Sequence, residues 1–360
     1  MPNTPFYNPQ LTYEENYQNG PFGHFASFPK SIPKTKKMYQ FLGETVNSPF
    51  GIPSGPILNS RFVKAAFAWG FDIVTYKTVR SSFFPSHSWP NILPVKIKSG
   101  FRESDLDISV KSKKKYENSK HNLSITNSFG VPSQNASVWQ NDFKKALAYA
   151  KKGQILIASV MGTKKAGMGI NRFVDDYVHT ACLAKEAGAK VLEINLSCPN
   201  LGGESLICYD KDVTLKIVSA TKKQIGNNKL LVKFGYFPRS MTKLLESIID
   251  DIHNYIDGVC AINTIAARVV DDCGHQVLPG EGRIKSGICG FAIKKMGVLM
   301  VDKLHKIRAK KNYNYAIVGI GGVMSKEDFY LYKKHKADVI QSATGAMWNS
   351  GLAIEIKQSL

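Results

Sequence analysis

The sequence predicts an α/β protein with a (β/α)8 (TIM) barrel, and three observations support this fold. From about residue 47 onward, short apolar runs alternate with amphipathic stretches, which is typical of parallel β/α units. The apolar runs number eight, the strand count of such a barrel. A doubly wound sheet is the alternative, but the Gly-x-Gly-x-x-Gly turn expected after its first strand is absent from the sequence. The predicted strands are residues 49–53, 71–78, 154–160, 190–196, 230–234, 258–264, 315–319 and 338–342.

Helices are predicted between these strands, at residues 60–69, 172–187, 213–224, 241–253, 290–309, 326–334 and 346–358. Gly70 and Gly188 follow two of them, where glycine commonly ends a helix. Residues 1–46, rich in Pro, Asn, Gly, Tyr and Phe, are predicted to form an N-terminal arm packed over the barrel or its partner. The barrel then spans residues 47–360. Its segment 79–140 is too long for a simple loop and is predicted to be an inserted, partly β segment after strand two.

Composition restricts the classes of function. No run approaches the roughly 18 apolar residues that span a membrane, and residues 1–10 lack the features of a secretory signal, so a cytoplasmic protein without a membrane partner is predicted. The net charge of +20 is unusual. Because the lysines are spread along the chain, apart from a cluster at 111–115, a solvated surface is favoured over a nucleic-acid site. The six cysteines show no close pairing, so neither a metal site nor a disulfide framework is predicted.

Candidate site residues stand at the carboxyl ends of the strands, where barrel active sites assemble. Strand one is followed by Ser54-Gly55, whose small side chains let a flat ligand approach the backbone. Strand two ends in Lys77-Thr78, and strand six ends in Asn263-Thr264. The inserted segment returns toward the barrel through residues 127–132, Asn-Ser-Phe-Gly-Val-Pro.

Glycines after the last two strands predict a phosphate-bearing cofactor. Gly321-Gly322 follow strand seven, and Thr344-Gly345 follow strand eight at the start of a predicted helix. Unobstructed backbone N–H groups and a helix start together bind phosphate. Gly287 and Gly290 are predicted to add a further part of this cradle.

Two lysines, Lys77 and Lys233, close strands that are otherwise apolar. A lysine there is costly to bury without a partner. Lys233 suits the N1/C2 oxygen side of a flavin, where reduction builds negative charge, and Lys77 suits a carboxylate or another part of the flavin ring. The alternative for each is a strand-end lysine whose amine extends into solvent.

Strand four is followed by Asn195-Leu196-Ser197-Cys198-Pro199-Asn200. Its two outer amides offer donors and acceptors for a polar heterocycle. The thiol of Cys198, with an ordinary pKa of about 8.5, can be tuned for proton transfer. A turn with a half-buried cysteine is the alternative, and the other strand ends favour the site.

Together these motifs resemble dihydroorotate dehydrogenase of class 1, over roughly residues 47 to 360. The resemblance implies an FMN-containing barrel that oxidises dihydroorotate to orotate in pyrimidine biosynthesis. It implies that Cys198 takes the C5 proton while the C6 hydride moves to flavin N5, with Lys77 beside it in the catalytic group. The implied substrate-binding residues are Lys77, Asn127, Phe129, Gly130, Val131, Asn195, Asn200, Asn263 and Thr264. The implied FMN-binding residues are Ser54, Gly55, Lys77, Thr78, Asn195, Lys233, Gly287, Gly290, Gly321, Gly322, Thr344 and Gly345.

Within class 1, the stretch Cys208-Tyr209-Asp210 resembles the homodimeric type, which implies fumarate as electron acceptor. The NAD-using type needs a partner subunit with FAD and an iron–sulfur cluster, on which this chain gives no information. The loop 201–205 departs from the Pro-Gly-Lys-Pro-like sequence of the fumarate type, and Glu204 reverses its charge. Membrane-associated class 2 members use quinone and carry serine at the position of Cys198.

Two other flavoenzyme families remain alternatives. A dihydropyrimidine dehydrogenase-like reductase shares FMN, the barrel and a Ser-Cys-Pro element, but that family places histidine at the position of Asn200. An RNA-acting enzyme similar to tRNA-dihydrouridine synthase explains the charge of +20 directly. It is expected to carry a helical RNA-binding domain after the barrel, whereas this sequence stops at Leu360, one helix beyond strand eight.

Overall fold

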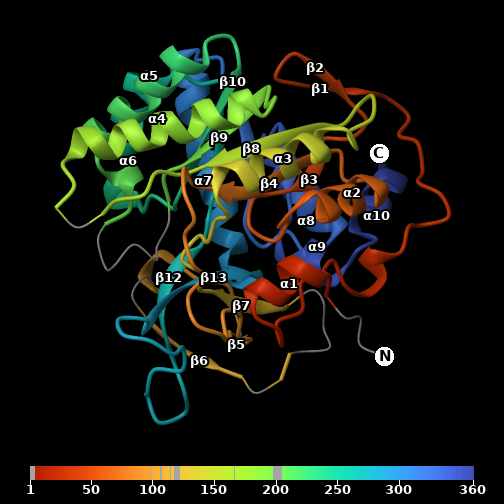
Figure 1. Cartoon of the computed structure of the whole chain (residues 1–360), viewed down its shortest axis with the longest axis vertical. Coiled ribbons are helices and arrows are strands. Elements are labelled where there is room, and N and C mark those ends of the chain that lie inside the picture. Colours follow the sequence, from red (N-terminus) through yellow and green to blue (C-terminus); the bar gives the residue numbers. More distant parts are fainter. Residues whose placement is uncertain are drawn as a thin grey trace.

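Eight parallel strands close into a barrel at the centre of the molecule (Figure 1). The computed structural model describes residues 5–97, 99–105, 108–113, 115–116, 122–165, 167–197 and 205–360. Each barrel strand coincides with one of the eight apolar runs, so the predicted fold is confirmed. In order around the barrel they are β3 (Phe50–Ile52), β4 (Ile73–Val79), β8 (Ile155–Val160), β9 (Val191–Asn195), β10 (Lys229–Phe234), β11 (Gly258–Ala261), β14 (Ala316–Ile320) and β15 (Val339–Gln341).

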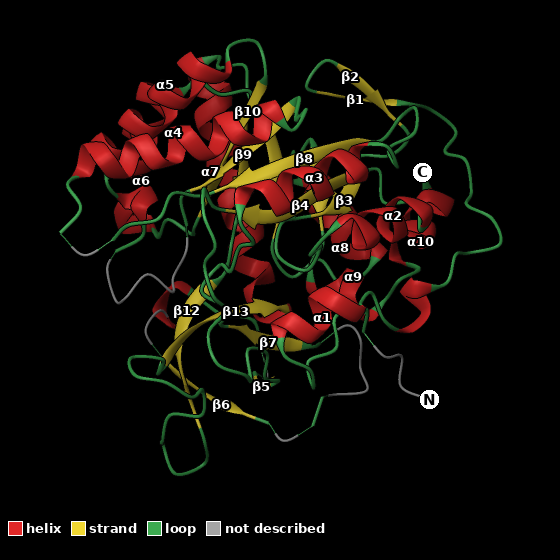
Figure 2. Cartoon of the chain, in the orientation of Figure 1, coloured by secondary structure: helices red, strands yellow, loops and turns green. Residues whose placement is uncertain are grey.

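Helices cover the outside of the barrel (Figure 2). Those at predicted positions are α2 (Ser60–Ala68), α4 (Ile170–Glu186), α5 (Lys211–Ile225), α6 (Thr242–Ile252), α7 (Lys294–Lys311) and α8 (Lys326–Lys334). Gly70 and Gly188 adopt φ values of +87° and +95° just after α2 and α4, which confirms the predicted helix ends. Within the described part of the chain, no helix has both the length and the apolar character to cross a membrane.

The helices differ from the sequence prediction most clearly at three places. The predicted helix 346–358 is two helices, α9 (Thr344–Trp348) and α10 (Leu352–Ser359), because the chain turns at Asn349–Gly351. The predicted helix 290–309 begins only after Gly290, which ends a strand with φ +85°. A further helix, α3 (Ala136–Leu147), begins inside the range 79–140; Trp139, Phe143 and Ala146 form its buried face.

A second sheet lies beside one end of the barrel (Figure 2). Its strands follow the order β5-β6-β12-β13-β7 and come from two distant parts of the chain. The inserted segment supplies β5 (Val95–Lys96), β6 (Ser109–Ser112) and β7 (Ser124–Asn127), and the segment after β11 supplies β12 (Ile265–Val270) and β13 (Lys285–Gly290). The predicted strand 258–264 is therefore too long, since β11 ends at Ala261 and the chain leaves the barrel there.

The barrel interior is apolar at the end away from this sheet. The hairpin of β1 (Tyr39–Phe41) and β2 (Glu44–Val46) closes that end, where Phe41 and Val46 pack against interior residues such as Val191 and Leu231. The N-terminal arm carries α1 (Tyr13–Asn19), whose start is fixed by a capping box between Thr12 and Glu15. Short 3₁₀ turns occur at Gly23–Ala26, Glu103–Asp105, Ile207–Tyr209, Arg239–Met241 and Phe291–Ile293.

Candidate functional site

A large pocket opens at the carboxyl ends of the barrel strands, between the barrel, the second sheet and the N-terminal arm. Its walls are formed by residues from many separate parts of the chain. The pocket is lined by many of the residues singled out from the sequence: Ser54, Gly55, Lys77, Thr78, Asn127, Phe129, Gly130, Val131, Asn195, Lys233, Asn263, Thr264, Gly290, Gly321, Gly322, Thr344 and Gly345.

The remaining predicted site residues lie elsewhere or outside the described ranges. Gly287 is not part of the pocket lining; a Cβ at this position would lie 2.3 Å from the hydroxyl oxygen of Thr264, so this glycine makes room for a side chain of the pocket wall. Cys198 and Asn200, and also Glu204 in the loop that departs from the family pattern, lie outside the described residues. The described chain reaches the edge of that loop at Ser197 and resumes at Ser205.

Both strand-end lysines are buried in the pocket wall rather than extended into solvent. Lys77 is 7% exposed and Lys233 is 3% exposed. The Lys233 ammonium donates to the hydroxyl of Ser54 at 3.0 Å, and the Lys77 ammonium donates to the carbonyl of Thr78 at 3.4 Å. A buried positive charge favours an anionic or electron-rich ligand in the space it faces.

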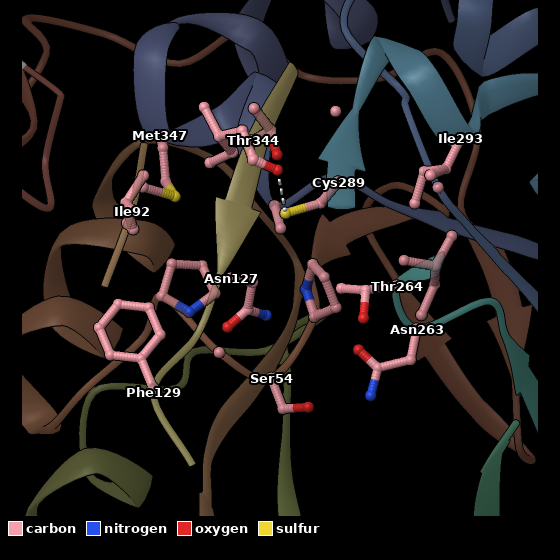
Figure 3. A pocket seen from close by; sticks show the side chains of 18 of the residues that line it. Ser54, Ile92, Asn127, Phe129, Asn263, Thr264, Cys289, Ile293, Thr344 and Met347 are labelled. Atoms are coloured by element: carbon pink, nitrogen blue, oxygen red, sulfur yellow. Dashed lines mark hydrogen bonds between the residues drawn. The ribbon is translucent and has the colours of Figure 1, made fainter. Parts of the chain in front are cut away.

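Asn195, the last residue of β9, and Asn263, just after β11, brace the segment that leads to Cys198. The side-chain oxygen of Asn195 accepts from the backbone N–H of Ser197 at 3.1 Å, and the amide of Asn263 donates to the Ser197 carbonyl. The hydroxyl of Tyr177 donates to the Asn195 carbonyl at 3.0 Å. In Figure 3, Asn127, Asn263 and Thr264 reach into the same space. Amide and hydroxyl groups are therefore gathered on this side of the pocket.

Two buried arginines, neither of them predicted from the sequence, hold the backbone of residues 127–132, the predicted substrate segment. Arg80 donates to the carbonyls of Gly130 at 3.2 Å and Val131 at 2.9 Å. From the other side, Arg283 donates to the carbonyl of Ser128 at 3.1 Å and to its hydroxyl at 3.0 Å. The guanidinium group offers five donors in a fixed plane, which suits it to fixing several carbonyls at once.

The glycine turns after β14 and β15 are packed too tightly for side chains. A Cβ at Gly345 would lie 2.3 Å from the Val323 carbonyl oxygen, and one at Gly322 would lie 2.7 Å from the Gly290 carbonyl oxygen. Ser342 joins the two turns, since its hydroxyl donates to the Val323 carbonyl and accepts from the Ala346 N–H. Because α9 has only five residues, backbone N–H groups rather than a helix dipole are the main attraction for an anion here.

The opposite side of the pocket is apolar, and of its residues only Phe129 was predicted. Ile92, Phe129 and Met347 lie together there in Figure 3, and the arm adds Tyr7 and Tyr13, which pack edge-on against Phe129. Burial raises the pKa of both tyrosine hydroxyls well above the ordinary value, so both stay neutral. The aromatic-rich arm is visible in the sequence, but which of its rings reach the pocket depends on tertiary packing.

One cysteine of the described chain lies in the pocket wall. Cys289 directly precedes the pocket residue Gly290, and the Thr344 hydroxyl bonds to its sulfur (Figure 3). Burial raises the pKa of this thiol to about 12. At neutral pH it is therefore protonated and unable to act as a base.

Outside the pocket, Asp271, Cys273 and His275 bring three potential metal ligands within 4.8 Å of one another in the loop between β12 and β13. The Asp271 carboxylate accepts from the backbone N–H groups of Cys273 at 2.8 Å and His275 at 2.9 Å. The turn itself therefore accounts for their proximity.

Comparisons with known proteins point to one family. A family model described as dihydroorotate dehydrogenase matches residues 114–360. Dihydroorotate dehydrogenase of Dictyostelium discoideum is 32% identical over 361 aligned residues, which cover 98% of this chain and 96% of that protein. The catalytic subunit of dihydroorotate dehydrogenase B (NAD(+)) from Methanocaldococcus jannaschii is 28% identical over 159 residues, 44% of this chain and 48% of that protein.

Solved structures share the fold. The crystal structure of DHODH from Eimeria tenella in complex with ferulenol superposes with a TM-score of 0.72 at 19% identity, covering 94% of this chain and 88% of that one. The ligand-free form of the same enzyme gives a TM-score of 0.68 at 18% identity, covering 93% and 90%.

Proposed function

This chain belongs to the dihydroorotate dehydrogenase family, and from that premise we propose that it oxidises dihydroorotate to orotate with bound FMN, as a step of pyrimidine biosynthesis. The observation that carries the proposal is the convergence of Lys77, Lys233, Asn127, Asn195 and Asn263 in one pocket, although they come from five separate parts of the chain. Buried ammonium groups and side-chain amides in one cavity suit an electron-accepting ring and a substrate that carries a carboxylate and a pyrimidine ring.

The residues present fit FMN. The close-packed turns at Gly321–Gly322 and Thr344–Gly345 would hold the phosphate through backbone N–H groups, with Gly290 beside them. Lys233 would lie at the N1/C2 oxygen side of the ring, where its buried charge offsets the negative charge that develops on reduction. When bound, FMN supplies a two-electron acceptor for the substrate hydride. The ring would also contact Ser54, Gly55, Lys77, Thr78 and Asn195.

The substrate would lie between the ring and the segment held by Arg80 and Arg283. Lys77 suits its carboxylate, and the amides of Asn127, Asn195, Asn200 and Asn263, with Thr264, suit the polar edge of the pyrimidine ring. Phe129, Gly130 and Val131 would cover its face. We propose that Cys198, as thiolate, takes the proton from C5 while the C6 hydride leaves with two electrons for flavin N5. The C5–H and C6–H bonds break, a C5=C6 double bond forms, and the products are orotate and reduced flavin.

We propose fumarate as the electron acceptor. We also propose that the protein is a cytoplasmic homodimer that has no nucleic-acid partner. Cys198 at the base position supports class 1, and the stretch Cys208-Tyr209-Asp210 supports its homodimeric type. The loop 201–205 is where this chain departs from the fumarate type, so the acceptor has to be measured.

Stopped-flow spectroscopy tests the function and the acceptor together. We expect the flavin of the purified yellow protein to bleach anaerobically when dihydroorotate is added, and to reoxidise faster with fumarate than with NAD⁺, quinone or oxygen. Bleaching by NADPH alone, without bleaching by dihydroorotate, would instead support a reductase of the dihydropyrimidine or dihydrouridine type.

The glycine turns give a separate prediction about FMN binding. Gly345→Ala places a methyl group 2.3 Å from the Val323 carbonyl oxygen, so the turn must shift. Overpacking of this kind costs about 1–3 kcal/mol, and 1.4 kcal/mol is tenfold in affinity, so we expect FMN to bind about tenfold more weakly or worse. Fluorescence titration of the apoprotein with FMN measures the change.

Gly169→Ala is the matched control for this variant. Gly169 precedes α4 with φ −68°, and a Cβ there would meet no atom within 4 Å. Its FMN affinity should equal that of the wild type. If Gly345→Ala also binds FMN as tightly as the wild type does, the phosphate does not lie at these turns.

A further inference from the structure

A carboxylate is buried inside the barrel, directly beneath the pocket. Glu193 lies on β9 and is 0% exposed. One of its oxygens accepts from the Ser54 hydroxyl at 3.0 Å, and the other has no nitrogen or oxygen donor among the described residues. A buried carboxylate is strongly disfavoured unless a positive charge or several donors compensate it, so its presence needs a reason.

The compensating charge is Lys233, and Ser54 connects the two. The Lys233 ammonium donates to the Ser54 hydroxyl at 3.0 Å, and the same hydroxyl donates to Glu193 at 3.0 Å. The three residues come from β10, the turn after β3, and β9, so the barrel itself sets their relative positions. A single hydroxyl group therefore separates the ammonium from the carboxylate.

The position of Glu193 along its strand places it between the apolar core and the pocket. Residues two apart on a strand point to the same side, so Val191, Glu193 and Asn195 share the barrel interior. Val191 belongs to the apolar cluster at the closed end of the barrel, and Asn195 lines the pocket. In the sheet register Lys233 pairs with Asn195, one layer above Glu193. The carboxylate is thus close enough to act on the ammonium without itself lining the pocket.

A neighbouring thiol is also affected by this carboxylate. Burial, and then the charge of Glu193, raise the pKa of Cys260 on β11 well above its ordinary value; Lys233 acts in the opposite direction, and a hydrogen bond of the thiol to Glu193 adds to the rise. The thiol stays protonated and does not neutralise Glu193. Cys260 therefore offers no alternative counter-charge.

We propose that Glu193 is a positioning residue for the flavin site: through Ser54 it holds the Lys233 ammonium in the pocket wall and offsets part of its charge, and it thereby keeps the reduction potential of the bound flavin low. The proposal rests on the proposed FMN site. An ammonium without this counter-charge stabilises reduced flavin more strongly than one that is partly neutralised, because reduction adds negative charge at the side that Lys233 faces. A lower potential makes it easier for the reduced flavin to pass its electrons to an acceptor.

Glu193→Gln tests the proposal, because the amide oxygen can still accept from Ser54 while the negative charge is lost. We expect the ratio of affinities for reduced and oxidised FMN to rise at least tenfold, which is about 30 mV for a two-electron couple. The measurement is anaerobic reduction of the FMN-loaded protein against a reference dye. Glu193→Asp keeps the charge and should stay close to the wild-type potential. An unchanged or lower potential in Glu193→Gln overturns the proposal.

Asp257→Asn is the matched control. This carboxylate pairs with Lys222 at 3.4 Å and Lys229 at 2.9 Å at the other end of β10, away from the pocket lining, and its replacement should leave the potential unchanged. Lys233→Gln and the double variant Glu193→Gln/Lys233→Gln give a second comparison, measured with FMN added in excess so that weak retention does not prevent it. The double variant lacks both charges and should have the higher potential of the two; an equal or lower one overturns the proposal. Wild-type protein that binds no FMN would contradict the proposed function itself. That outcome differs from FMN-loaded protein in which Glu193→Gln leaves the potential unchanged, which contradicts only the role of Glu193.

Discussion

Cys198→Ala should reduce its flavin with dihydroorotate about 10²- to 10⁴-fold more slowly than the wild type near pH 7, while FMN stays bound. The reason is that alanine cannot accept the C5 proton, so that bond has to break without a positioned base. Anaerobic stopped-flow absorbance of the flavin measures the rate directly. Cys198→Ser should recover activity only as pH rises, because a hydroxyl loses its proton far less readily than a thiol does.

Cys289→Ala is the control for a general effect of removing a thiol from the site. Cys289 lines the pocket, but burial raises its pKa to about 12, so it is protonated at neutral pH and cannot serve as the base. Replacing Cys289 with alanine should change the rate of flavin reduction far less than replacing Cys198 with alanine does. Reduction at the wild-type rate in Cys198→Ala would remove the base assignment.

Lys357→Met should lower the free energy of unfolding by about 3 kcal/mol. Lys357 lies on α10 and pairs with Asp72 at 2.7 Å, next to the start of β4; their side chains are 5% and 0% exposed. Removing the ammonium leaves a buried carboxylate without its counter-charge. The Ser48 hydroxyl, which donates to Asp72 at 2.6 Å, compensates in part, so the effect lies at the lower end of the usual 3–5 kcal/mol for such pairs. Equilibrium unfolding in denaturant measures it.

The double variant Asp72→Asn/Lys357→Met should recover part of the lost stability, because no unpaired charge remains inside. Lys306→Ala breaks the ion pair with Asp302 on the surface of α7, where the lysine side chain is 74% exposed, and should change stability by less than about 1 kcal/mol. Equal losses in Lys357→Met and Lys306→Ala would show that burial of the Asp72 pair contributes nothing.

The barrel could be predicted from sequence because its strands are defined locally. Each is a short apolar run between turn residues, and parallel strands with helices between them have few ways to pack. The candidate site could also be predicted from the locally defined strands, because the residues at their carboxyl ends meet at one end of a barrel regardless of how the side chains pack. This is why Lys77, Lys233 and Asn263 could be assigned to one pocket before their positions were known.

The second sheet could not be predicted in this way. β12 and β13 contain small and polar residues such as Ala266, Ser286 and Gly287, and they are strands because they pair with partners elsewhere in the chain. The same holds for Arg80 and Arg283, whose carbonyl partners lie about 50 and 155 positions away along the chain. Glu193 is a charged residue in an apolar strand and therefore noticeable, but Ser54, which explains it, is 139 positions distant.

The pairing of β7 with β13 sets an order of events during synthesis of the chain. Asn127 faces Gly287 in that sheet, so a ribosome that has just released the first strand must add about 160 further residues before the pair can form. The turns of the proposed phosphate cradle come later still, at residues 321–322 and 344–345. Domains fold as their residues emerge, N-terminal parts first. If FMN binds as proposed, a nascent chain holds no complete flavin site until its last strand is made, and binding of the cofactor marks the end of folding rather than guiding its beginning.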